Sequence, residues 1–100
     1  MIVITHTPGK ISVKGHAGYA PHGQDIVCAA ISTLLQVFVE AVDKFTNDKI
    51  NTKMAAGNAV ILYEHLTEQA QLLMNAFLLG VEMIAESYPD NVKYVQALNT

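Results

Sequence analysis

The chain has 100 residues, of which 51% are hydrophobic and 15% are charged. This length fits a single domain over residues 1–100, and the apolar content excludes a disordered chain, because burial of this much apolar surface offsets the entropy lost on folding. Nine acidic residues against six lysines give a net charge of −3, which argues against a direct nucleic-acid partner. Because so few charges cover so small a domain, we predict that apolar surface pairs two copies in a homodimer.

Residues 1–15 are predicted to form a β-hairpin. Met1 to Thr5 is rich in β-forming residues, and Ile11 to Lys14 alternates apolar and polar side chains. The intervening Thr7-Pro8-Gly9-Lys10 suits a type II turn, since proline fixes φ and glycine accepts a positive φ. Because no basic region and no long apolar segment precede Pro8, we expect no signal peptide and a cytoplasmic location.

A glycine-rich loop is predicted to lead into the longest helix. Gly15 to Gly23 holds three glycines and one proline, so we expect a mobile loop there. Asp25 is a suitable N-cap for a helix that reaches Phe45. Since this helix is apolar around most of its circumference, we expect it to be central and largely buried. Its longest unbroken apolar run, Ile26 to Ile31, is far shorter than the ~20 residues of a membrane span, and we expect no membrane partner.

The second half of the chain is predicted to add strands, a helix and a last strand. Lys53 to Ala55 and Ala59 to His65 favour strands, joined around Gly57. Thr67 is expected to cap a helix that Pro89 ends, and Val92 to Leu98 is expected to form a strand at a sheet edge. The order ββαββαβ predicts an α+β two-layer domain with a small antiparallel or mixed sheet and two helices.

The single cysteine lies where a thiol is expected to be reactive. One cysteine excludes an internal disulfide and a CxxC site. With Asp25 as the N-cap, Cys28 lies in the first helical turn, where unpaired N–H groups and the helix dipole favour a thiolate. His16 precedes the loop, which can fold back so that the imidazole takes the thiol proton. We also expect the N–H groups of this turn to face a tetrahedral oxyanion.

Other interpretations of these residues stay open. Asp25 and Ser32 share a helix face with Cys28; Asp25 can orient His16 or only cap the helix, and Ser32 can bond the sulfur, the substrate or its own i−4 carbonyl. Cys28 can also be an inert core residue, and His22 can replace His16 as the base. A metal site of His16, His22 and Cys28 lacks a fourth ligand, and a redox sensor lacks a second cysteine, so we expect neither a metal nor another cofactor.

The segment from Gly15 to Ser32 resembles the signature of the ribosomal-processing cysteine proteases, the Prp family. The matching residues are Gly15-His16-Ala17, a short glycine-bearing loop, and Gly23-Gln24-Asp25-Ile26-Val27-Cys28-Ala29-Ala30-Ile31-Ser32. Length, element order and the Tyr88-Pro89-Asp90 stop extend the resemblance over the whole chain. It implies a homodimeric cysteine endopeptidase that trims the short N-terminal extension of a bacterial large-subunit ribosomal protein, number twenty-seven.

The resemblance also implies roles for single residues. Cys28 would be the nucleophile that forms a thioester, His16 the general base, and Asp25 and Ser32 supporting residues. The implied substrate and loop residues are Gly15, Ala17, Gly18, Tyr19 and Gly23. The implied partner is the precursor ribosomal protein, and no cofactor is needed. The alternative is a non-catalytic ribosome-assembly protein that binds a peptide without cleaving it.

Overall fold

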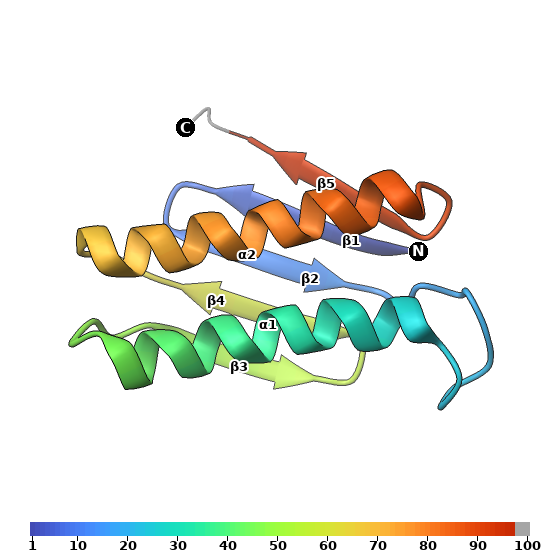
Figure 1. The fold of residues 1–100 in the computed structure, drawn as a ribbon, viewed down its shortest axis with the longest axis horizontal. Helices are drawn as coiled ribbons and strands as arrows, with labels where there is room; N and C mark the ends of the chain where they lie inside the picture. Colours follow the sequence, from blue (N-terminus) through green and yellow to red (C-terminus); the bar gives the residue numbers. More distant parts are fainter. Residues whose placement is uncertain (98–100) are drawn as a thin grey trace.

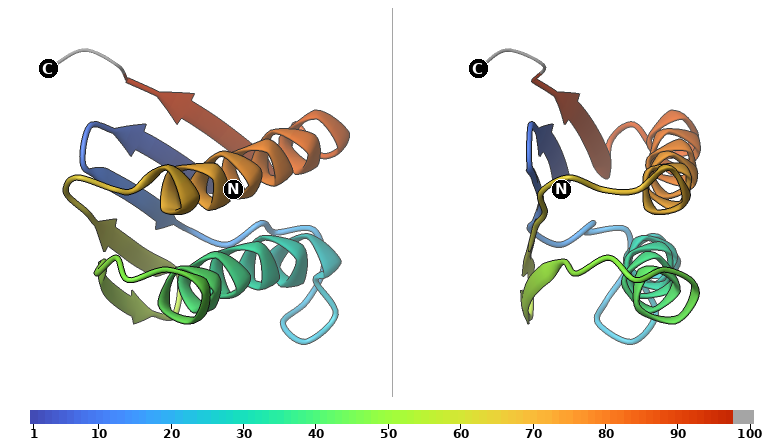
Figure 2. Two further views of the ribbon diagram at one scale, coloured as in Figure 1. Left: turned by 60° about the vertical axis from the view of Figure 1, so that its left-hand side comes forward. Right: turned by 90° about the vertical axis from the view of Figure 1, so that its left-hand side faces the viewer.

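The computed structural model describes residues 1–97, which form seven elements: β1 (Ile2–Thr7), β2 (Lys10–Lys14), α1 (Ile26–Phe45), β3 (Asn51–Ala55), β4 (Asn58–Leu62), α2 (Glu68–Ser87) and β5 (Val92–Gln96) (Figure 1). The strands form one sheet in the order β3-β4-β2-β1-β5. All neighbours are antiparallel except β1 and β5, which are parallel. Both helices cover the same face of this sheet (Figure 2). The predicted two-layer α+β fold with a mixed sheet and the order ββαββαβ is therefore confirmed.

The element boundaries follow local signals. Gly9 takes φ +78 in the β1–β2 turn, as the predicted turn requires. The fourth strand ends at Leu62 and not at His65, because Leu62 pairs with Lys10, the first residue of β2; His65 lies beyond the strand with φ +49, a left-handed conformation that a strand does not accept. The last strand lies at the sheet edge as predicted, although Leu98, the last residue predicted for it, lies outside the described residues.

The core lies between the sheet and the two helices. In β1, β2 and β4 alternate residues are buried apolar side chains, which is the spacing that one covered sheet face requires, whereas the edge strand β3 buries none. Phe38 of α1 and Phe77 of α2 stack with ring centroids 5.3 Å apart. The fully buried side chains around them are Ile4, Ile11, Ile31, Ile61, Val27, Val42 and Val81. This core fixes α1 above the β3–β4 side of the sheet, with its first turn at the end of β2 (Figure 1).

The prediction that α1 is central and largely buried is wrong. By length and composition α1 is apolar enough to cross a membrane, yet only one stripe of it enters the core. Its outer face is open, and Val37 is 60% and Phe45 71% exposed. In α2, Leu72 and Leu79 are also more than half exposed. A two-layer fold covers each helix from one side only, so apolar residues beyond that stripe remain at the surface.

Candidate active site

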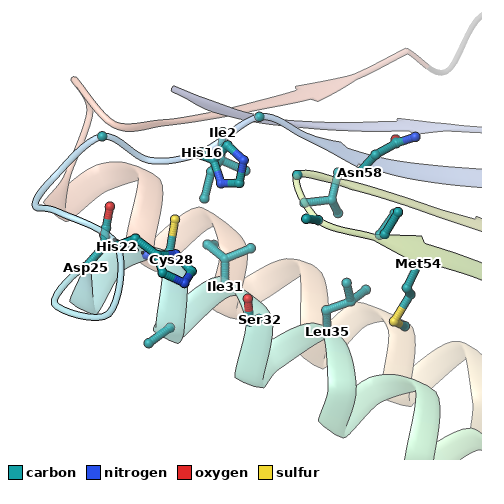
Figure 3. Close-up of a pocket in the computed structure, with 18 of the residues that line it drawn as sticks. Ile2, His16, His22, Asp25, Cys28, Ile31, Ser32, Leu35, Met54 and Asn58 are labelled. Atoms are coloured by element: carbon teal, nitrogen blue, oxygen red, sulfur yellow. Dashed lines mark hydrogen bonds between the residues drawn. The ribbon is translucent and has the colours of Figure 1, made fainter.

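The predicted site residues gather around one cleft at the start of α1. The cleft has a volume of about 790 Å³ and is bounded by the first half of α1, the loop after β2 and the β3–β4 hairpin (Figure 3). His16, Asp25, Cys28 and Ser32 all line it. Of the predicted loop residues, Gly15, Gly18 and Gly23 line it, whereas Ala17 and Tyr19 do not.

Asp25 caps α1 with its carboxylate. One oxygen accepts the N–H groups of Val27 at 3.0 Å and Cys28 at 2.9 Å, and the other accepts the N–H of Tyr19 at 3.0 Å. These backbone hydrogen bonds, led by that from Cys28, lower the pKa of the Asp25 carboxyl. The Val27 and Cys28 N–H groups are thus already paired with Asp25, and the expectation that the first turn faces an oxyanion is wrong for these two groups in this arrangement. Within residues 1–97, the Asp25 carboxylate accepts hydrogen bonds from backbone N–H groups and not from His16.

Cys28 occupies the predicted position in the first turn of α1, and its side chain is half-buried. Its Sγ accepts a hydrogen bond from the backbone N–H of Ala17 at 3.2 Å. Ala17 itself is only 2% exposed, and its carbonyl accepts a bond from the Asn91 side chain at 3.0 Å. The sulfur is held from the loop side of the cleft.

His16 follows β2 and lies above Cys28, whose sulfur points toward it (Figure 3). The imidazole rests on the backbone of Gly57 in the β3–β4 turn: a Cβ there would lie 2.7 Å from the His16 Nε2. Gly57 is tied to this strand end, because its carbonyl accepts the Gly15 N–H at 2.9 Å. Gly57, with φ +71 and no Cβ, therefore leaves the space that the His16 imidazole occupies.

The loop between β2 and α1 is anchored at several points. Besides the bond to Asp25, the Tyr19 ring meets the Tyr88 ring edge-on with centroids 5.4 Å apart. Gly18 and Gly23 have φ of +68 and +88, and a Cβ at either would meet open space. These two glycines are suited to act as hinges, and the predicted loop motion stays a prediction.

Two further residues contribute to the cleft wall. His22 lies beside Cys28, and Ser32 lies one turn along α1 from it (Figure 3). Within residues 1–97 no group of three or more His, Cys, Asp or Glu residues is arranged to hold a metal ion, so the alternative site of His16, His22 and Cys28 is not formed.

Sequence reasoning missed two contributors to this site. Gly57 was expected only as a turn residue, and its contact with His16 depends on the sheet order. Asn91 gave no signal at all, because its partner Ala17 is 74 residues away. Only the fold brings these residues to the cleft.

Comparison with known proteins places these features in one family. A family model described as cysteine protease Prp matches residues 2–93. The ribosomal processing cysteine protease Prp of Bacillus subtilis is 28% identical over 98 residues, covering 89% of this chain and 88% of its own. The protein of the same name from Mycoplasma genitalium is 33% identical over 95 residues, covering 92% of each chain.

A solved structure shares the whole fold. The crystal structure of an essential ribosomal processing protease Prp from S. aureus, in complex with a covalently linked product peptide, superposes with a TM-score of 0.92 and 26% identity. The similarity covers 97% of this chain and 100% of that one.

Proposed function

Because this chain belongs to the cysteine protease Prp family, we propose that it removes the short N-terminal extension of a bacterial large-subunit ribosomal protein, number twenty-seven. The chain is a cysteine protease, and its relatives are named for ribosomal processing. One observation carries the assignment of the nucleophile: the chain has a single cysteine, and this cysteine lines the same cleft as His16. A cysteine protease with one thiol has no other candidate, so we assign the attack to Cys28.

The proposed reaction uses both side chains in turn. The His16 imidazole takes the proton of the Cys28 thiol, and the thiolate sulfur forms a bond to the carbonyl carbon of the scissile peptide. The C–N bond then breaks, and the imidazolium gives its proton to the leaving amine, which leaves a thioester on Cys28. Water, deprotonated by His16, attacks the thioester and releases the carboxylic acid and the free thiol. The product peptide linked covalently to the S. aureus relative supports a covalent intermediate of this type.

The remaining parts of the proposal concern the partner and the assembly. A net charge of −3 with no arginine suits a basic ribosomal precursor more than an acidic one. We further propose that the exposed apolar face of α1 and α2, which includes Val37, Leu72 and Leu79, pairs two copies in the cytoplasm. Light scattering at micromolar concentration tests the dimer, and a monomeric mass would contradict it.

Mass spectrometry of a synthetic peptide that spans the precursor junction tests the reaction. The wild-type protein should produce two fragments from one bond, whereas Cys28→Ala and His16→Ala should produce none while remaining folded. His65→Ala is the matched histidine control, since His65 is exposed and does not line the cleft, and it should cleave like the wild type. Cleavage of the same bond by Cys28→Ala would end the proposal. The non-catalytic alternative has no support from a family of proteases, and fragment formation would exclude it.

A further inference from the structure

Asn91 joins the end of α2 to the active-site loop, although it lies far in the sequence from the Gly15 to Ser32 segment that resembles the Prp signature. Its backbone is fixed on both sides: its N–H donates to the Tyr88 carbonyl at 2.9 Å, and its carbonyl accepts the Ile2 N–H at 2.9 Å. The half-buried side chain is therefore held in place, and its Nδ2 donates to the Ala17 carbonyl at 3.0 Å. The contact connects the start of β1, the α2–β5 connection and the loop.

Ala17 is the residue whose N–H reaches the nucleophile. Its two backbone polar groups have one partner each, the Cys28 sulfur at 3.2 Å for the N–H and Asn91 for the carbonyl. Glycines with positive φ lie close on both sides, Gly15 at +98 and Gly18 at +68. Because glycine adopts many backbone conformations, the chain around Ala17 has little stiffness of its own. The Ala17 side chain is packed in the core, and the bond from the fixed Asn91 side chain further restricts the orientation of the Ala17 backbone.

We propose that Asn91 is a positioning residue for the Cys28 nucleophile, which acts by holding Ala17 so that its N–H stays directed at the sulfur. This inference rests on the proposed role of Cys28. Without the Asn91 amide, the Ala17 carbonyl loses its partner in a buried position and the loop turns to find another. The N–H then no longer holds the sulfur in place, and attack by Cys28 becomes slower.

Two substitutions remove the donor in different ways. Asn91→Asp keeps the size and shape of the side chain but loses the N–H group at neutral pH, and Asn91→Leu loses it without adding charge. Asn47→Leu is the matched control, since Asn47 is exposed between α1 and β3 and does not line the cleft. Asn91→Gln keeps a carboxamide and serves as the rescue variant.

The primary measurement is the rate of Cys28 alkylation by iodoacetamide as a function of pH. Because the Ala17 N–H is then no longer directed at the sulfur, Asn91→Leu and Asn91→Asp should be alkylated about tenfold more slowly near neutral pH, a loss of the size expected for one hydrogen bond. Asn91→Gln should recover part of the rate, and Asn47→Leu should match the wild type. In ¹⁵N-labelled wild type the Ala17 amide resonance should shift when Cys28 is alkylated, and in the Asn91 variants it should not. Peptide cleavage should lose kcat at nearly constant KM.

The outcomes separate this inference from the proposed function, because alkylation and resonance shifts need no turnover. If the wild type does not cleave the peptide but the Asn91 variants shift both readouts, the positioning role stands and the proposed function fails. If the wild type cleaves and a folded Asn91→Asp keeps the wild-type alkylation profile, the positioning role is overturned. Should Asn91→Leu not fold, the near-isosteric Asn91→Asp decides the question alone.

Discussion

The contact between Gly57 and His16 gives the most specific prediction, made with Gly57→Ala. An ideal Cβ at position 57 lies 2.7 Å from the His16 Nε2, and ordinary contacts begin at 3.4 Å. The imidazole must therefore move by at least about 0.7 Å, a displacement comparable to the ~1 Å misplacement that can cost about 100-fold in rate. Because His16 is exposed, the ring can move without a large loss of stability, and the loss falls on catalysis.

The expected result is a fall in kcat/KM of about 10- to 100-fold, measured with the junction peptide. A non-glycine residue in the left-handed conformation at φ +71 also costs about 1–2 kcal/mol of folding free energy. In a domain of this size that lowers the melting temperature by about 4–16 °C. Activity must therefore be assayed well below the transition of the variant.

Gly9→Ala separates the two effects. Gly9 has φ +78, and its Cβ would lie 3.3 Å from the Tyr63 carbonyl, far from the cleft lining. This variant should lose a similar amount of stability and keep the wild-type kcat/KM. Full activity in a folded Gly57→Ala protein would refute the reasoning, because the position of the His16 ring against Gly57 would then have no catalytic consequence.

Three further predictions concern stability. Hydrogen bonds from the backbone lower the pKa of Asp25 below 3.8. The ionised carboxylate therefore stabilises the fold above that pH, and this stabilisation is lost as the pH falls through the lowered pKa. Urea denaturation at a series of acid pH values should show a smaller loss of stability in Asp25→Asn than in the wild type. Burial lowers the pKa of His6 below 6.5, so the free energy of unfolding should decrease as the pH falls from 6.5. His6→Gln can keep the 2.8 Å bond to Tyr63 and should remove this dependence of stability on pH. An unchanged pH dependence in His6→Gln would contradict this account. Phe38→Ala removes the ring stacked on Phe77 and should cost about 3–5 kcal/mol in urea denaturation, and a cost near zero would contradict the described core.

The parts of the structure that follow from neighbouring residues were predictable from the sequence. The Pro8-Gly9 turn gave the first hairpin, Asp25 and Thr67 gave the two helix starts, and Pro89 gave the end of α2. In each case one or two side chains satisfy backbone groups within a few residues, so the signal is local.

The parts that depend on distant residues were not predictable. The exposure of α1 depends on how many layers the fold has, and an apolar helix composition alone fits either a central helix or a one-sided one. The partners of the candidate catalytic pair, Gly57 beneath His16 and Asn91 behind Ala17, follow from the sheet order and from the return of the chain after α2. Local patterns placed Cys28 at a helix start but could not show that the N–H groups of Val27 and Cys28 are already bonded to the Asp25 carboxylate.

The central claim is that Cys28 attacks the scissile peptide and carries the acyl group. Intact-protein mass spectrometry of an acid-quenched reaction with the junction peptide tests this claim most directly. The account predicts a transient adduct with the mass of the acyl fragment on Cys28, which hydroxylamine removes as it removes a thioester, and no adduct in Cys28→Ala. Peptide cleavage in Cys28→Ala, or an acyl adduct located on another residue, would contradict it.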